Sequence, residues 1–186
     1  MSKVGIASCS HYAWIASSLT MGKSLAEAIG EGVECRVHTP VDRAGLIAVL
    51  EDSDYFIMHT HGSAVGFYDQ RASGKSTTIA TLSGIKSFPE FPRLRLVVIT
   101  ACEAAKEEEK GNIACALSTR IARDGLVIAN RYVVFGADHD FGEREDKQGW
   151  VAYQNGRLVL PEDVLPARIT MPDAYRIFLD YRKGVL

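Results

Sequence analysis

Two residues with complementary chemistry follow two mostly apolar segments of the chain. Residues 55–60 lead into His61, and residues 94–101 lead into Cys102. An imidazole can take the proton of a thiol, and the resulting thiolate is the nucleophile. If the two segments are neighbouring strands, these side chains can face one crevice. The pattern therefore predicts a Cys–His dyad, with His61 as the general base and Cys102 as the nucleophile.

Backbone groups next to the two side chains can supply a second requirement of acyl transfer. Gly62 has no side chain, so a substrate can approach its backbone closely. Backbone N–H groups stabilise the negative charge that develops on a substrate oxygen. We expect the N–H groups of Gly62 and Cys102 to act as this oxyanion site.

The elements that must position these residues follow from the hydrophobic pattern. Short apolar segments alternate with helical stretches, which is typical of a parallel α/β sheet. Ligands of such sheets bind beyond the carboxyl ends of the strands. The pattern predicts strands at 3–8, 34–38, 55–60, 94–101 and 125–130, helices at 13–29, 42–50, 81–87, 112–123 and 171–183, and hairpins within 64–79 and at 150–160, the latter turning at Asn155 and Gly156.

The motifs at both strand ends resemble the caspase-like cysteine peptidases, which include caspases, metacaspases, clostripain and the bacterial CHAT domains. The likeness rests on residues 56–62 (FIMHTHG) and 96–104 (LVVITACEA), and residues 112–128 are similar to the CHAT helix and strand that follow. CHAT sequences usually continue Ala-Cys-Glu-Thr-Gly, whereas this chain reads Ala-Cys-Glu-Ala-Ala.

This resemblance implies a single caspase-like domain over residues 1–186. Its fold would be a three-layer, flavodoxin-like α/β arrangement with a mostly parallel sheet, followed by a C-terminal hairpin and helix. The family implies that His61 and Cys102 form the catalytic dyad. It also implies that the loop after the first strand helps to line the specificity pocket, here Ser8, Cys9, Ser10 and His11.

The expected function is hydrolysis of peptide bonds in a peptide or protein substrate, without a cofactor. One alternative is an inactive caspase-like module that binds a protein partner. Another is a metal-dependent hydrolase that uses His59 and His61, because residues two apart in a strand point to the same face. Asp138, His139 and Asp140 could complete such a metal site.

Composition excludes several other classes. The net charge is −2 and is balanced along the chain, so we expect no nucleic-acid partner. No apolar run approaches ~18 residues, so we expect no membrane span.

None of the four cysteines forms a C-x-x-C pair, and we interpret Cys9, Cys35 and Cys115 as packing residues. The first residues have a strand pattern and not that of a signal peptide. These features favour a cytoplasmic protein with free thiols and leave the oligomeric state undetermined.

Two further polar segments are interpreted as surface loops. Residues 72–77 (ASGKST) look like the end of a phosphate-binding loop, but the glycine that the motif needs is replaced by Asp69. We interpret this segment as the tip of a hairpin. The acidic residues 138–146 are expected to form a solvated loop, and the functional alternative is a lid near the crevice that prefers basic side chains.

Overall fold

The computed structural model describes residues 1–40, 42–70, 76–132 and 149–186. In chain order its elements are β1 (Lys3–Ser8), α1 (Tyr12–Ile29), β2 (Glu34–His38), α2 (Arg43–Glu51), β3 (Tyr55–His59), β4 (His61–Ser63), β5 (Gly66–Gln70), β6 (Ser76–Thr81), α3 (Leu82–Lys86), β7 (Leu96–Ile99), α4 (Ile113–Ser118), β8 (Leu126–Asn130), β9 (Trp150–Gln154), β10 (Arg157–Leu160) and α5 (Met171–Arg182). The predicted alternation of strands and helices is confirmed. No helix in these ranges combines the length and the apolarity that crossing a membrane requires.

The large sheet is mostly parallel, as predicted. Its strand order is β10-β9-β8-β7-β3-β1-β2. β1, β2, β3, β7 and β8 are parallel, and the hairpin of β9 and β10 joins them antiparallel to β8. The segments before His61 and Cys102 are direct neighbours, because β3 pairs with β7 in parallel with Met58 opposite Ile99. Their carboxyl ends therefore meet at the same edge of the sheet.

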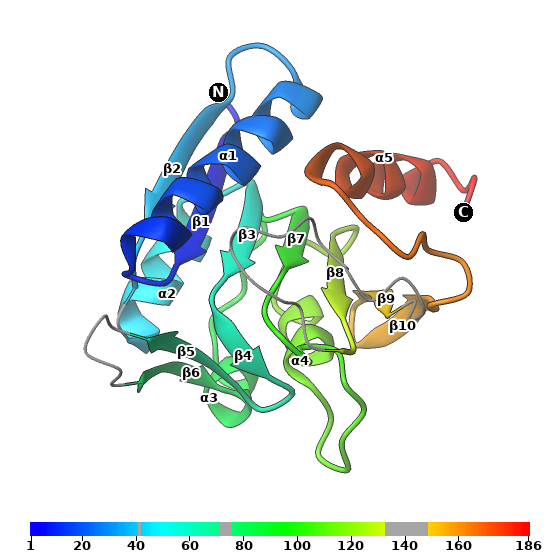
Figure 1. Ribbon diagram of the computed structural model, residues 1–186. Coiled ribbons are helices and arrows are strands. Elements are labelled where there is room, and N and C mark those ends of the chain that lie inside the picture. Colours follow the sequence, from blue (N-terminus) through cyan, green and yellow to red (C-terminus); the bar gives the residue numbers. More distant parts are fainter. Residues whose placement is uncertain (41, 71–75, 133–148) are drawn as a thin grey trace.

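Helices pack against both faces of this sheet (Figure 1). Successive side chains of a strand point to opposite faces. Phe56 and Met58 of β3 join an apolar cluster with α2, α3 and α4, whereas Tyr55 and Ile57 join a second cluster with α1 and α5. Because both faces are covered, the central strands are apolar almost throughout, which is why the sequence reveals them so clearly.

Polar side chains fix where the helices begin. The predicted N-cap is confirmed, since the Asp42 side chain accepts a hydrogen bond from the Gly45 N–H at 2.8 Å. Thr170 and Asp173 form a reciprocal capping box at the start of α5. At the β9–β10 turn, Asn155 and Gly156 have φ angles of 47° and 76°, so this predicted hairpin turn is also confirmed.

Helix α4 is shorter than the predicted helix 112–123. Asn112 caps its start, but the helix ends at Ser118 with Thr119 as the C-cap. The next residues pair with the segment before β7, since Ile121 forms a parallel bridge with Phe91. The Ala122 N–H also donates to the Leu94 carbonyl at 2.9 Å. Tertiary hydrogen bonding thus ends a helix that local pattern alone would extend.

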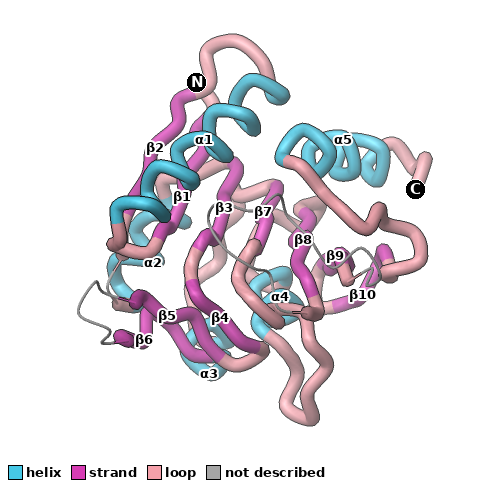
Figure 2. The backbone as a smooth tube through the Cα atoms, in the orientation of Figure 1, coloured by secondary structure: helices cyan, strands magenta, loops and turns pink. Residues whose placement is uncertain are grey.

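A second, smaller sheet lies at the carboxyl end of β3 (Figure 2). It has the antiparallel order β4-β5-β6, so the hairpin predicted within 64–79 is confirmed as β5 and β6. Strand β4 was not predicted. It pairs His61 with Tyr68 and Gly62 with Phe67. The chain thus leaves β3 and directly enters a second sheet, with His61 at the junction.

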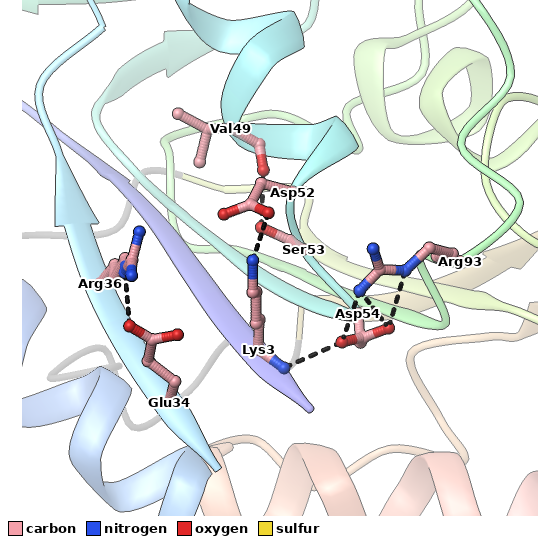
Figure 3. Close-up of polar contacts among 8 residues, drawn as sticks. All are labelled: Lys3, Glu34, Arg36, Val49, Asp52, Ser53, Asp54 and Arg93. Atoms are coloured by element: carbon pink, nitrogen blue, oxygen red, sulfur yellow. Dashed lines mark hydrogen bonds and ion pairs between the residues drawn. The ribbon is translucent and has the colours of Figure 1, made fainter. Parts of the chain in front are cut away.

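The amino edge of the large sheet is held by charged side chains (Figure 3). Lys3 pairs with Asp52 at 2.5 Å, and its backbone N–H donates to Asp54 at 2.9 Å. Arg93 bonds both oxygens of the same Asp54 carboxylate. These contacts join the starts of β1 and β3 to the segment before β7, at the end opposite to His61 and Cys102.

Candidate active site

The close approach of two backbones defines the candidate site. Beyond the paired strands, the Thr100 N–H still donates to the Met58 carbonyl at 2.9 Å, so the two chains stay together past β7. A methyl group at Gly62 would lie 2.6 Å from the Ala101 Cβ and 3.3 Å from the Cys102 carbonyl oxygen. A side chain at this position would force one of the two segments to move. Glycine therefore lets the segment after His61 lie directly against the segment that carries Cys102.

His61 is half-buried at the start of β4, where residues of β5 and α1 lie against it. Tyr68 of β5 is its cross-strand partner. The indole of Trp14, from the first turns of α1, contacts its ring with centroids 4.8 Å apart. Burial lowers the pKa of His61 below its ordinary value, and the negative charge of Asp69 opposes this shift. The imidazole is thus neutral at neutral pH, which is the form that can accept a proton.

Cys102 is half-buried in a tight turn just beyond β7. The end of β8 holds this turn, because the Glu103 N–H donates to the Tyr132 carbonyl at 2.9 Å and the Ala105 N–H donates to the Asn130 carbonyl at 3.0 Å. Glu103 has a φ angle of 53°, a left-handed conformation that is uncommon outside glycine. Cys102 therefore lies in a turn that backbone hydrogen bonds hold in place directly after a strand.

The four residues of the predicted specificity loop, from the end of β1 to the start of α1, divide into buried and exposed residues. Ser8 and Cys9 are fully buried, whereas Ser10 and His11 are exposed. The Cys9 thiol lies 3.6 Å from the Tyr68 carbonyl oxygen, and His11 caps α1 by accepting from the Ala13 N–H at 3.3 Å. Only the second half of the loop therefore presents side chains to solvent.

Sequence reasoning missed a buried carboxylate beside this loop. Asp69 of β5 is only 1% exposed. Its carboxylate accepts hydrogen bonds from the Ser10 N–H at 2.8 Å and from the Ser10 hydroxyl at 2.9 Å. The sequence places Asp69 in a polar hairpin and gives no sign of its burial, because its hydrogen-bond partner Ser10 lies far away in the chain. Asp69 joins the predicted loop to the small sheet.

His59 is buried and is held in place by α1. Its Nδ1 lies 2.8 Å from the Ser18 hydroxyl, and its ring contacts Trp14 with centroids 4.6 Å apart. Burial and the neighbouring His61 lower the pKa of His59 to about 4. The sequence pairs His59 with His61 as possible metal ligands, but their environments differ.

Other candidate residues can be placed only in part. Within the described ranges, no group of three or more His, Cys, Asp or Glu side chains is arranged to hold a metal ion. Asp138, His139 and Asp140 and the rest of the acidic segment lie outside the described residues, so the metal alternative stays untested. The segment that resembles a phosphate-binding loop runs into β6 and not into a long helix.

The remaining cysteines behave as packing residues, as predicted. Cys35 packs against the apolar cluster of α1 and α5, and Cys115 packs against the opposite cluster. Burial raises the pKa of both thiols. A raised pKa leaves little thiolate at neutral pH, so neither thiol is suited to nucleophilic attack.

Comparison with known proteins adds no further assignment. No protein-family model matches the chain, and no curated protein matches its sequence. Function must therefore be argued from the residues and their surroundings.

Proposed function

We propose that the protein is a caspase-like cysteine peptidase that hydrolyses peptide bonds with a Cys102–His61 dyad. The observation that carries this proposal is the contact of Gly62 with the backbone of Ala101 and Cys102 at the carboxyl ends of neighbouring parallel strands. The motif likeness at His61-Gly62 and Ala101-Cys102-Glu103 supports it. So does the layout of the elements, with helices on both faces of the sheet and a hairpin and helix at the C-terminal end.

In the proposed mechanism, neutral His61 accepts the proton of the Cys102 thiol. The thiolate attacks the carbonyl carbon of the scissile peptide bond, and the negative charge moves to the carbonyl oxygen. The N–H groups of Gly62 and Cys102 would stabilise this oxyanion. When the carbon–nitrogen bond breaks, the imidazolium gives its proton to the leaving amine and a thioester remains. Water, with His61 again as the base, then hydrolyses the thioester and releases the carboxylic acid and the thiol.

The buried Asp69 favours a substrate with a basic side chain. Its carboxylate is bonded by Ser10, the residue where the predicted specificity loop becomes exposed. Both donors are neutral, so these bonds do not cancel the negative charge. That charge also acts on His61, which places it near the proposed dyad. Because Asp69 is itself buried, its charge would attract a lysine or arginine side chain of the substrate from a distance and not by direct contact.

Two alternatives predict different assay results. An inactive caspase-like module would bind a partner without cleaving peptides. A metal-dependent hydrolase would use His59 and His61 and would not need Cys102. The proposed peptidase needs the thiolate and needs no catalytic metal.

Hydrolysis of fluorogenic peptides by the full chain separates the three possibilities. The peptides should carry lysine, arginine, aspartate or leucine before the scissile bond, and each should be assayed with and without EDTA. We expect cleavage after the basic residues, unaffected by EDTA and lost in Cys102→Ala, while Cys115→Ala serves as the matched thiol control. Loss of activity with EDTA together with full activity of Cys102→Ala would contradict the proposal and favour the metal enzyme.

A further inference from the structure

Helix α1 carries two side chains, one turn apart, that hold the pair of histidines. Trp14 contacts the rings of both His59 and His61, at centroid distances of 4.6 Å and 4.8 Å. Ser18 lies four residues later on the same helix face. Its hydroxyl lies 2.8 Å from Nδ1 of His59. One helix face therefore contacts the end of β3 and the start of β4 together.

These contacts form an ordered series from the buried interior to the candidate site. Ser18 and His59 are buried, so their hydrogen bond fixes the His59 ring. The fixed His59 ring lies against Trp14, and Trp14 lies against the half-buried ring of His61. Interplanar angles of 36° and 50° show tilted contacts and not parallel stacks. The indole thus occupies one side of the His61 imidazole.

We propose that Trp14 is a positioning residue for His61, whose indole ring, braced by His59 and Ser18, fixes the orientation of the His61 imidazole and keeps water from one side of it. This role rests on the proposed function, because a fixed imidazole matters only if His61 exchanges a proton with Cys102. General base catalysis requires the base within hydrogen-bond reach of the proton that it takes. A ring that rotates freely would spend little time in that geometry.

The groups around His61 allow the effect of Trp14 to be separated from charge effects. Asp69 of β5 raises the pKa of His61, whereas burial lowers it more strongly. The other titratable neighbours are His59 of β3 and Tyr68 of β5, and the segment that carries Cys102 lies against Gly62. Trp14 carries no charge. Replacing it therefore changes solvation and orientation while the charged neighbours stay in place.

Histidine titration by NMR in the full-length protein tests the role directly. In Trp14→Ala, the titration midpoint of His61 should rise toward its ordinary value of 6.5, because water reaches the ring. Trp14→Phe keeps an aromatic face and should restore the midpoint of the unmodified protein. Tyr12→Ala removes a ring of the same helix that is 82% exposed, and it should leave the midpoint unchanged. An unchanged His61 midpoint in Trp14→Ala would overturn the proposal.

The alkylation rate of Cys102 reports the consequence for the dyad. At pH 7 we expect iodoacetamide to label Cys102 roughly tenfold more slowly in Trp14→Ala, with recovery in Trp14→Phe. If Cys102 is no more reactive than the other thiols even in the unmodified protein, the proposed function fails. The NMR titration would still decide the role of Trp14, so the two failures are distinguishable.

A fluorescence measurement avoids the risk that Trp14→Ala does not fold. A protonated imidazole in contact with an indole quenches its emission. In Trp150→Phe, where Trp14 is the remaining tryptophan, emission should fall as the pH decreases through the midpoint of His61. Adding His61→Ala should remove that step and leave any step caused by His59 near pH 4. Emission that does not respond to His61 would overturn the proposed contact.

Discussion

His59 and His61 are two residues apart, yet their surroundings give them different chemistry. His59 is 3% exposed and bonded to Ser18, and its pKa is lowered to about 4. His61 is half-buried, and the Asp69 charge counteracts part of its desolvation. The sequence shows an identical pair, and only the contacts with α1 and β5 distinguish a buried structural histidine from a candidate base.

The buried state of His59 predicts how stability depends on pH. Its pKa is about 4 in the folded protein and 6.5 when unperturbed, so between these values the unfolded chain binds a proton that the folded protein does not. The contribution of His59 to the free energy of unfolding should therefore have its full value above pH 6.5 and decrease as the pH falls toward 4. The loss is roughly 3 kcal/mol at most.

Urea unfolding at several pH values measures this dependence. In His59→Gln, the slope of unfolding free energy against pH should become flatter over the same interval. His61→Gln is the comparison. The pKa of His61 is also lowered, so this variant should flatten the slope in the same direction but by less. An unchanged slope in His59→Gln would contradict the burial argument, whatever the change in absolute stability.

At the scale of elements, the junction between β3 and β4 determines the geometry of the site. The chain passes from one sheet to another within two residues, and Gly62 lies against Ala101 and Cys102. The strand β3 was predictable because its burial on both faces makes it apolar. The strand β4 was not, because three residues are too few to show a period. The role of Trp14 was equally hidden, since its partners lie on other elements.

A methyl group at Gly62 should disturb this junction. Gly62→Ala would place its Cβ 2.6 Å from the Ala101 Cβ, so one backbone must move. We expect a loss of about 1–3 kcal/mol in the free energy of unfolding by urea, and slower labelling of Cys102. The matched control is Gly45→Ala within α2, where the nearest atoms would lie 3.4 Å away. That substitution should be neutral or stabilising, because alanine favours helices. Equal stability of both variants would contradict the close approach.

Across the whole molecule, the sequence revealed the sheet better than the site. The alternation of apolar segments and helices predicted a mostly parallel sheet, and β3 and β7 lie side by side, as the predicted dyad requires. His61 and Cys102 could be selected because strand ends in parallel sheets meet at one edge. Asp69 could not be selected, because its hydrogen-bond partner, Ser10, lies far away in the chain. The end of α4 also depends on a distant partner, Phe91.

The four cysteines, none of which is in a disulfide, provide an internal comparison for the central claim, the Cys102–His61 dyad. Burial raises the pKa of Cys35 and Cys115, and Cys9 is fully buried. Cys102 is half-buried beside the segment that carries His61. A partnered thiol holds more thiolate at neutral pH, so its reaction with an electrophile should be the fastest of the four.

Mass-spectrometric mapping of iodoacetamide labelling on the native protein tests this claim most directly. Time points at pH 7 should show Cys102 labelled well ahead of Cys9, Cys35 and Cys115, and His61→Ala should slow only Cys102. His38→Ala is the control for loss of a histidine elsewhere in the sheet. Preferential labelling of another thiol, or a Cys102 rate that is the same with and without His61, would contradict the dyad.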